Sequence, residues 1–115
     1  MGKMRDYFRL SIEAIRIIGL YRNWPEIVSN HFRRGKDTGE LTLWNGIQYK
    51  IHPRSTDMGL VREIHSENIY QIQRGDIRDG SVVIDIGAHI GIFSVFAASQ
   101  APNVTVYSFE PEPEN

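Results

Sequence analysis

Cysteine is absent from this sequence of 115 residues, and its absence excludes several kinds of chemistry at once. A chain without thiols forms no disulfide framework, carries no thiolate nucleophile and offers a metal no sulfur ligand. Histidine is scattered too thinly to supply metal ligands at the usual spacing, so we predict no metal site. The four histidines are His31, His52, His65 and His89. Lack of cysteine weakly favours a reducing compartment, which makes cytoplasm the default expectation.

An excess of charge of one sign is also missing, since 13 basic residues stand against 14 acidic ones and the formal net charge is -1. Such a chain as a whole has no long-range attraction for nucleic acid or for an anionic membrane. Long apolar runs are missing as well, because charged residues interrupt residues 1–20 too often for a signal peptide or a membrane span. The interrupting charged residues are Arg5, Asp6, Arg9, Glu13 and Arg16. The sequence therefore predicts a soluble protein without a nucleic-acid partner.

Residues 1–54 predict a first region of two helices and a β-hairpin. Apolar residues recur at helical spacing over residues 7–21, while charged residues fall on another face. This amphipathic helix either packs on its own domain, which its acidic residues favour, or binds a membrane surface or a partner. A second, short helix is expected to begin at Pro25, and residues 35–39 are expected to form a loop.

The hairpin is predicted from a turn dipeptide between two alternating arms. Asn45 and Gly46 suit a two-residue type I′ turn, in which both residues have positive φ. The apolar residues expected on the buried faces of the arms are Leu41, Leu43, Ile47, Tyr49 and Ile51.

Residues 55–115 predict a further helix, a short buried segment at residues 69–72 and then the first βαβ unit of an α/β domain. The run from residue 81 to 86 is apolar and β-branched apart from Ser81 and Asp85, as expected of a strand buried on both faces of a parallel sheet. A helix over residues 90–99 and a second, parallel strand over residues 104–109 complete the unit.

A glycine turn joins the first of these strands to the helix, and in parallel sheets ligands bind at such junctions. Gly87 lets the backbone turn sharply close to a ligand, and Gly91 is expected to allow tight helix packing. The spacing G-x-x-x-G differs from the G-x-G-x-x-G of dinucleotide sites, and Asp85 stands just before it. A carboxylate there repels a pyrophosphate but suits a ligand with ammonium and sulfonium groups. Taken singly, the same residues are explained by a tight turn and a helix N-cap.

A second acidic residue, Glu110, ends the second strand about twenty residues after the glycine turn, where a carboxylate can accept hydrogen bonds from both hydroxyls of a ribose. Pro111 follows it, and this proline either lies against an adenine ring or serves as a plain turn residue. The combination of acid, glycine turn, helix, second strand and terminal Glu110 predicts a cofactor site.

Two segments resemble the FkbM family of S-adenosylmethionine-dependent methyltransferases. They are residues 82–94, Val-Val-Ile-Asp-Ile-Gly-Ala-His-Ile-Gly-Ile-Phe-Ser, and residues 107–115, Tyr-Ser-Phe-Glu-Pro-Glu-Pro-Glu-Asn. Their order and spacing are those of the family, and a further likeness upstream extends the resemblance to about Thr56. It implies S-adenosylmethionine as the cofactor and a Rossmann-like methyltransferase core, of which this chain is expected to hold the N-terminal part.

The resemblance also implies roles for individual residues. Those expected to line the methionine and sulfonium side of the cofactor are Asp85, Gly87, Ala88 and Gly91. Glu110 would hold the ribose, and His89, at a variable position, would contribute mainly its backbone. Glu63, on the preceding helix, would reach the amino group of the cofactor, unless it is an ordinary exposed glutamate.

A member of this family is expected to methylate a hydroxyl group of a small-molecule or glycan acceptor: a sugar, a glycan or a secondary metabolite. Because a sulfonium is already an activated leaving group, the main task of the protein is alignment, with a base for an oxygen acceptor. The acceptor pocket and that base are expected after Asn115 in a longer chain. Two alternatives remain: a non-catalytic fragment that binds an adenosine cofactor, and an interaction scaffold whose first helices dock a partner.

Overall fold

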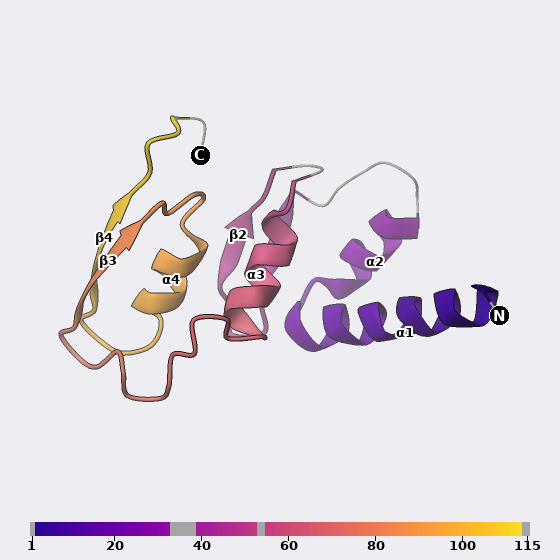
Figure 1. The fold of residues 1–115 in the computed structure, drawn as a ribbon, viewed down its shortest axis with the longest axis horizontal. Helices are drawn as coiled ribbons and strands as arrows, with labels where there is room; N and C mark the ends of the chain where they lie inside the picture. The colour runs from indigo at the N-terminus through magenta and orange to yellow at the C-terminus, as the bar shows by residue number, and fades with distance from the viewer. Residues whose placement is uncertain (1, 33–38, 53–54, 114–115) are drawn as a thin grey trace. The chain divides into compact units, whose positions relative to one another are not determined.

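The computed structural model describes residues 2–32, 39–52 and 55–113, which form a mixed α/β chain (Figure 1). The chain divides into two compact units, Met1–Met58 and Gly59–Asn115. Most of the predicted loop over residues 35–39 and the last two residues of the family resemblance lie outside the described residues. Within the described ranges, no helix is both long enough and apolar enough to cross a membrane.

Two helices open the first unit, α1 (Gly2–Leu20) and α2 (Trp24–Phe32) (Figure 1). Both helices predicted from the sequence are confirmed, although α1 begins earlier than its apolar spacing indicates. Pro25 lies in the first turn of α2, where its missing N–H costs no intrahelical hydrogen bond. Of the described side chains of α1, only that of Ile17 is buried. The expectation that this helix packs its apolar face on its own domain is confirmed toward its C-terminal end, where Ile17 and the following Tyr21 are buried. It is wrong toward the N-terminus, where Tyr7 and Leu10 are exposed.

The predicted hairpin is confirmed, with β1 (Glu40–Thr42) antiparallel to β2 (Gln48–Lys50), but its turn differs from the prediction. The Leu43 N–H donates to the Ile47 carbonyl at 2.9 Å, so three residues form the loop between this pair. Gly46 has a φ of 89° and is the one loop residue with positive φ, whereas a type I′ turn needs two. The two-residue type I′ turn is therefore wrong, and the loop is a three-residue loop closed by a left-handed glycine.

The core of the first unit contains residues from both helices and both arms of the hairpin. Its buried apolar side chains are Ile17, Tyr21, Ile27, Leu41, Leu43 and Tyr49. Ile47 and Ile51, which were also predicted for the buried faces, are half-buried. Asn23, between the two helices, ties them to the hairpin, because its Oδ1 accepts a hydrogen bond from the Thr42 N–H at 2.9 Å.

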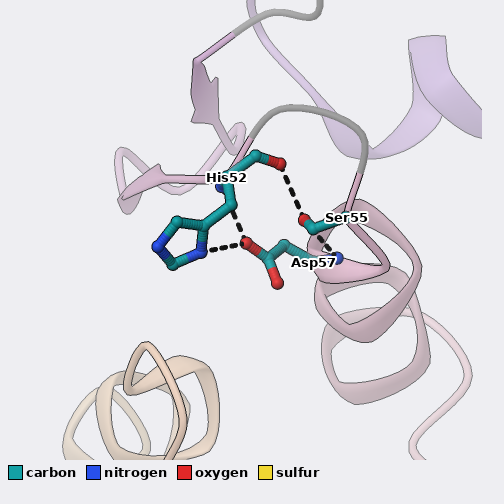
Figure 2. Close-up of polar contacts among 3 residues, drawn as sticks. All are labelled: His52, Ser55 and Asp57. Atoms are coloured by element: carbon teal, nitrogen blue, oxygen red, sulfur yellow. Dashed lines mark hydrogen bonds and ion pairs between the residues drawn. The ribbon is translucent and has the colours of Figure 1, made fainter. Parts of the chain in front are cut away.

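A buried carboxylate marks the start of α3 (Asp57–His65). Asp57 is fully buried, and its Oδ2 accepts a hydrogen bond from the His52 backbone N–H at 2.8 Å and lies 3.0 Å from His52 Nδ1 (Figure 2). The Ser55 hydroxyl donates to the His52 carbonyl at 2.7 Å and accepts from the Asp57 N–H at 3.1 Å (Figure 2). The carboxylate thus fixes the chain that leaves the hairpin to the first turn of α3, where a negative charge is also favoured by the helix dipole.

The second unit is built on two parallel strands, β3 (Val82–Ile86) and β4 (Thr105–Phe109), connected through α4 (Ile92–Ala98). The predicted β, α, β order and the parallel pairing are confirmed (Figure 1). The helix is shorter than the predicted span, because Gly91 precedes it with a φ of 81° and is not helical.

The two faces of this sheet differ. α4 lies on the face that carries Asp85 and Ser108, since Ser94 of α4 contacts both side chains. The side chains on the opposite face are exposed, and they are Val82, Ile84, Ile86, Tyr107 and Phe109. The expectation of a strand buried on both faces is therefore wrong for the described residues, because the one helix of this βαβ unit covers a single face.

The residues between α3 and β3 also depart from the prediction. Val61 and Ile64 of α3 are buried. Ile69 and Tyr70 of the predicted buried segment are instead 46% and 57% exposed, so that prediction is wrong. Tyr70 nevertheless contacts α4, because its ring centroid lies 4.8 Å from that of Phe93.

Removal of the Asp57 carboxylate is expected to destabilise the first unit. Asp57→Ala deletes a buried hydrogen-bond acceptor, which should lower the free energy of unfolding by about 2 kcal/mol. Urea denaturation followed by circular dichroism measures this change. Ser55→Ala is the control, since its exposed hydroxyl should cost less than about 1 kcal/mol. Equal stability of Asp57→Ala and the wild type would contradict the role assigned to the carboxylate.

Candidate functional site

The glycine turn and the end of β4 are joined by three hydrogen bonds at the carboxyl ends of the parallel strands. The Gly87 and Ala88 N–H groups donate to the Phe109 carbonyl at 2.8 and 3.1 Å. The His89 N–H donates to Glu110 Oε2 at 2.7 Å, across a sequence separation of 21 residues. Three successive N–H groups of the turn therefore face the end of β4.

Backbone torsion explains the two glycines of the motif. Gly87 and Gly91 have φ values of 77° and 81°, a region that side chains other than glycine rarely adopt. A Cβ atom built at either position meets no heavy atom within 4 Å. The expectation that Gly91 allows tight helix packing is therefore wrong among the described residues. His89, with a φ of 52°, adopts a left-handed conformation without being glycine.

The Glu110 carboxylate is oriented by two backbone donors. Oε2 accepts the His89 N–H, and Oε1 accepts the Glu112 N–H at 2.8 Å. These two backbone N–H groups orient the carboxylate at the end of the sheet. The contact with the turn also offsets the conformational cost of the positive φ at His89, which is on the order of 1 kcal/mol.

Asp85, the acid before the glycine turn, lies on the α4 side of the sheet and is 8% exposed. Its Oδ2 accepts a hydrogen bond from the Ser94 hydroxyl at 2.6 Å, and the Ser94 and Ser108 hydroxyl oxygens lie 2.5 Å apart. These hydroxyls lower the cost of burying the carboxylate. Ser108 was not predicted as part of the site, although its place directly opposite Asp85 in the parallel register could have indicated it.

A pocket of about 430 Å³ opens at the carboxyl ends of both strands. Its lining residues are Ile86, Gly87, Ser108, Phe109, Glu110 and Pro111. Three of the predicted site residues, Gly87, Glu110 and Pro111, therefore line one cavity. Glu63 lies on α3, half-buried, and no hydrogen bond between described residues joins its side chain to the pocket.

Two curated proteins are similar to part of the chain. It is 46% identical over 54 residues to 31-O-demethyl-FK506 methyltransferase FkbM of Streptomyces tacrolimicus, a stretch that covers 47% of this chain and 21% of that protein. It is 40% identical over 50 residues to AMB antimetabolite synthetase AmbE of Pseudomonas aeruginosa, which covers 44% of this chain and 2% of that protein. No family model and no solved structure matches the chain.

The first of these matches supports an FkbM-like methyltransferase relationship over part of the sequence. The chain spans about a fifth of the length of the first relative and a small fraction of the second.

A substitution at Gly91 separates torsion from packing in the glycine turn. Gly91→Ala should lower the free energy of unfolding by about 1–2 kcal/mol, because its Cβ meets open space and the cost comes from the positive φ alone. Gly91→Asn should cost less, since asparagine tolerates the left-handed region.

Urea denaturation of both variants measures these changes, with Gly59→Ala in α3 as the control. That control should be neutral or slightly stabilising, because alanine favours the helix more than glycine does. Equal and much larger losses for Gly91→Ala and Gly91→Asn would contradict the torsional explanation.

Proposed function

We propose that this chain is the cofactor-binding part of an S-adenosylmethionine-dependent methyltransferase with a Rossmann-like core. The observation that carries the proposal is the Glu110 carboxylate, which is held by the glycine turn at the carboxyl ends of two parallel strands. In open parallel sheets this edge is where ligands bind. The partial identity to a protein named as a methyltransferase gives the proposal its reaction class.

The residues at this edge fit such a cofactor in size and charge. The pocket of about 430 Å³ lies within the range of roughly 300–1,000 Å³ that is typical of small-molecule sites. A Cβ at Gly87 would project into open space, so a ligand can approach the backbone there. The six lining residues include one carboxylate, that of Glu110, and no basic side chain, which disfavours a pyrophosphate.

In this proposal each residue contributes by binding or orienting. Glu110 accepts hydrogen bonds from the ribose hydroxyls, and Pro111 packs against the adenine. Asp85 and the backbone of residues 87–91 lie on the methionine side, with His89 contributing its backbone. Glu63 remains a prediction from the family resemblance. When bound, S-adenosylmethionine supplies a methyl group on a sulfonium, an activated leaving group.

For the acceptor we propose a hydroxyl group on a sugar, a glycan or a secondary metabolite. The Streptomyces relative is named as the methyltransferase of 31-O-demethyl-FK506, and oxygen methylation is carried over from that name. An oxygen acceptor requires alignment with the methyl carbon and removal of its proton.

Calorimetric titration with S-adenosylhomocysteine tests the proposed site, both on this polypeptide and on any longer form of the gene product. Glu110→Gln should weaken binding by about 10- to 100-fold, since a hydrogen bond to a charged group is worth about 1.5–3 kcal/mol. Glu112→Gln is the matched control, because that exposed side chain lies two residues away and should leave the affinity unchanged.

Equal affinity of Glu110→Gln and the wild type would contradict the role given to Glu110. No binding to the longer, folded product would contradict the cofactor site itself. Binding without methyl transfer to hydroxyl acceptors by that product would instead favour the non-catalytic fragment considered above.

A further inference from the structure

α1 presents large apolar side chains that the first unit does not cover. Met4, Phe8 and Ile15 are 77%, 70% and 68% exposed, which is unusual for large apolar side chains. We call the exposed set the apolar stripe, and its members are Met4, Tyr7, Phe8, Ile12, Ile15 and Ile18. Counted from Met4, their separations of three, four, eight, eleven and fourteen residues place them on one side of the helix. Ile17, the buried residue of α1, lies on another side.

A row of basic side chains borders the apolar stripe. Arg5, Arg9 and Arg16 each follow a member of the stripe by one residue, so they form a parallel row along one edge, which we call the arginine row. All three are exposed. The two acidic residues of the helix, Asp6 and Glu13, lie beyond this row, farther from the stripe.

The arginine row and the apolar stripe meet at the N-terminal end of α1. A hollow of about 450 Å³ is lined there by Met4, Arg5, Phe8 and Arg9. This hollow has apolar side chains on one side and cationic groups on the other. Arg16, farther along, lies 3.8 Å from Glu13, and such an exposed pair contributes little in water and can be exchanged for another anion.

We propose that α1 is an interfacial anchor that binds the surface of a bilayer containing anionic lipids. In this arrangement the helix lies in the plane of the interface, with the apolar stripe among the acyl chains. The stems of the arginine row extend along the apolar boundary, and their guanidinium groups reach the lipid phosphates. The charge pattern selects this occupant, because a second copy of α1 would bring its own arginine row to the contact.

The near-neutral composition of the chain does not conflict with this proposal. Membrane attraction of this kind is local, and it decays within a Debye length of roughly 10 Å. The arginine row concentrates positive charge beside the surface that would be buried, and the two acids of the helix, Asp6 and Glu13, lie farther from that surface.

Co-sedimentation of the full chain with unilamellar vesicles tests the proposal. Equimolar phosphatidylserine and phosphatidylcholine should bind the chain, and phosphatidylcholine alone should bind it more weakly. Binding should weaken as salt is added. The single variants Arg5→Gln and Arg9→Gln should each lower the partition coefficient about fivefold, because one basic residue near the membrane surface is worth about 1 kcal/mol.

The double variant Phe8→Glu with Ile15→Glu should abolish binding, since it places two charges within the apolar stripe. Matched controls are Arg22→Gln, which removes an exposed arginine just after α1, and Ile69→Glu, which adds an acid at an exposed isoleucine in the second unit. Both controls should bind as the wild type does. Circular dichroism of each variant verifies that the helices are retained.

Three outcomes would overturn the proposal. The first is a lack of binding to anionic vesicles by the folded wild type, and the second is equal affinity for neutral and anionic vesicles. The third is a dimer in solution that Phe8→Glu with Ile15→Glu dissociates, without vesicle binding, which would make a second copy of the chain the occupant of the stripe.

Discussion

The hydrogen bond from the His89 N–H to the Glu110 carboxylate is the contact on which the geometry of the second unit depends. It closes the carboxyl end of a two-stranded parallel sheet that has no direct turn between its strands. Two hydrogen bonds close the other end of the sheet in a similar way. The Gly80 N–H donates to the Pro102 carbonyl at 3.2 Å, and the Asn103 side-chain amide donates to Asp79 Oδ1 at 2.9 Å. Both ends of β3 and β4 are therefore held in register by contacts between loops.

This arrangement makes one carboxylate serve the fold and the proposed cofactor. The backbone donors that hold Glu110 also orient it toward the end of the sheet, so a ligand need not order it on binding. A site whose binding group is already positioned loses less conformational entropy when the ligand arrives. The same coupling means that a change at Glu110 affects the turn as well as the pocket.

Local features of this fold could be predicted from the sequence because they leave a residue-level signal. The helices and strands follow apolar spacing, and Gly87 and Gly91 mark positions of positive φ. The type of the hairpin loop was mispredicted, because the dipeptide at residues 45 and 46 is compatible with loops of two or three residues, and the strand pairing decides between them.

Features that depend on contacts between distant residues could not be predicted in this way. The partner of Glu110 lies 21 residues away and follows from the strand register, as does the placement of Ser108 beside Asp85. β3 was predicted to be covered on both faces, but only one face is covered. The sequence pattern shows that its residues are apolar, and it does not show how many helices pack against the sheet.

The central claim is that the glycine turn and Glu110 form the cofactor site, and amide NMR during titration with S-adenosylhomocysteine tests it most directly. We expect the largest chemical-shift changes on the Gly87, Ala88 and His89 amides, which follow β3 and donate to the end of β4. Saturable changes confined to other parts of the chain, or no change at all in the folded protein, would contradict it.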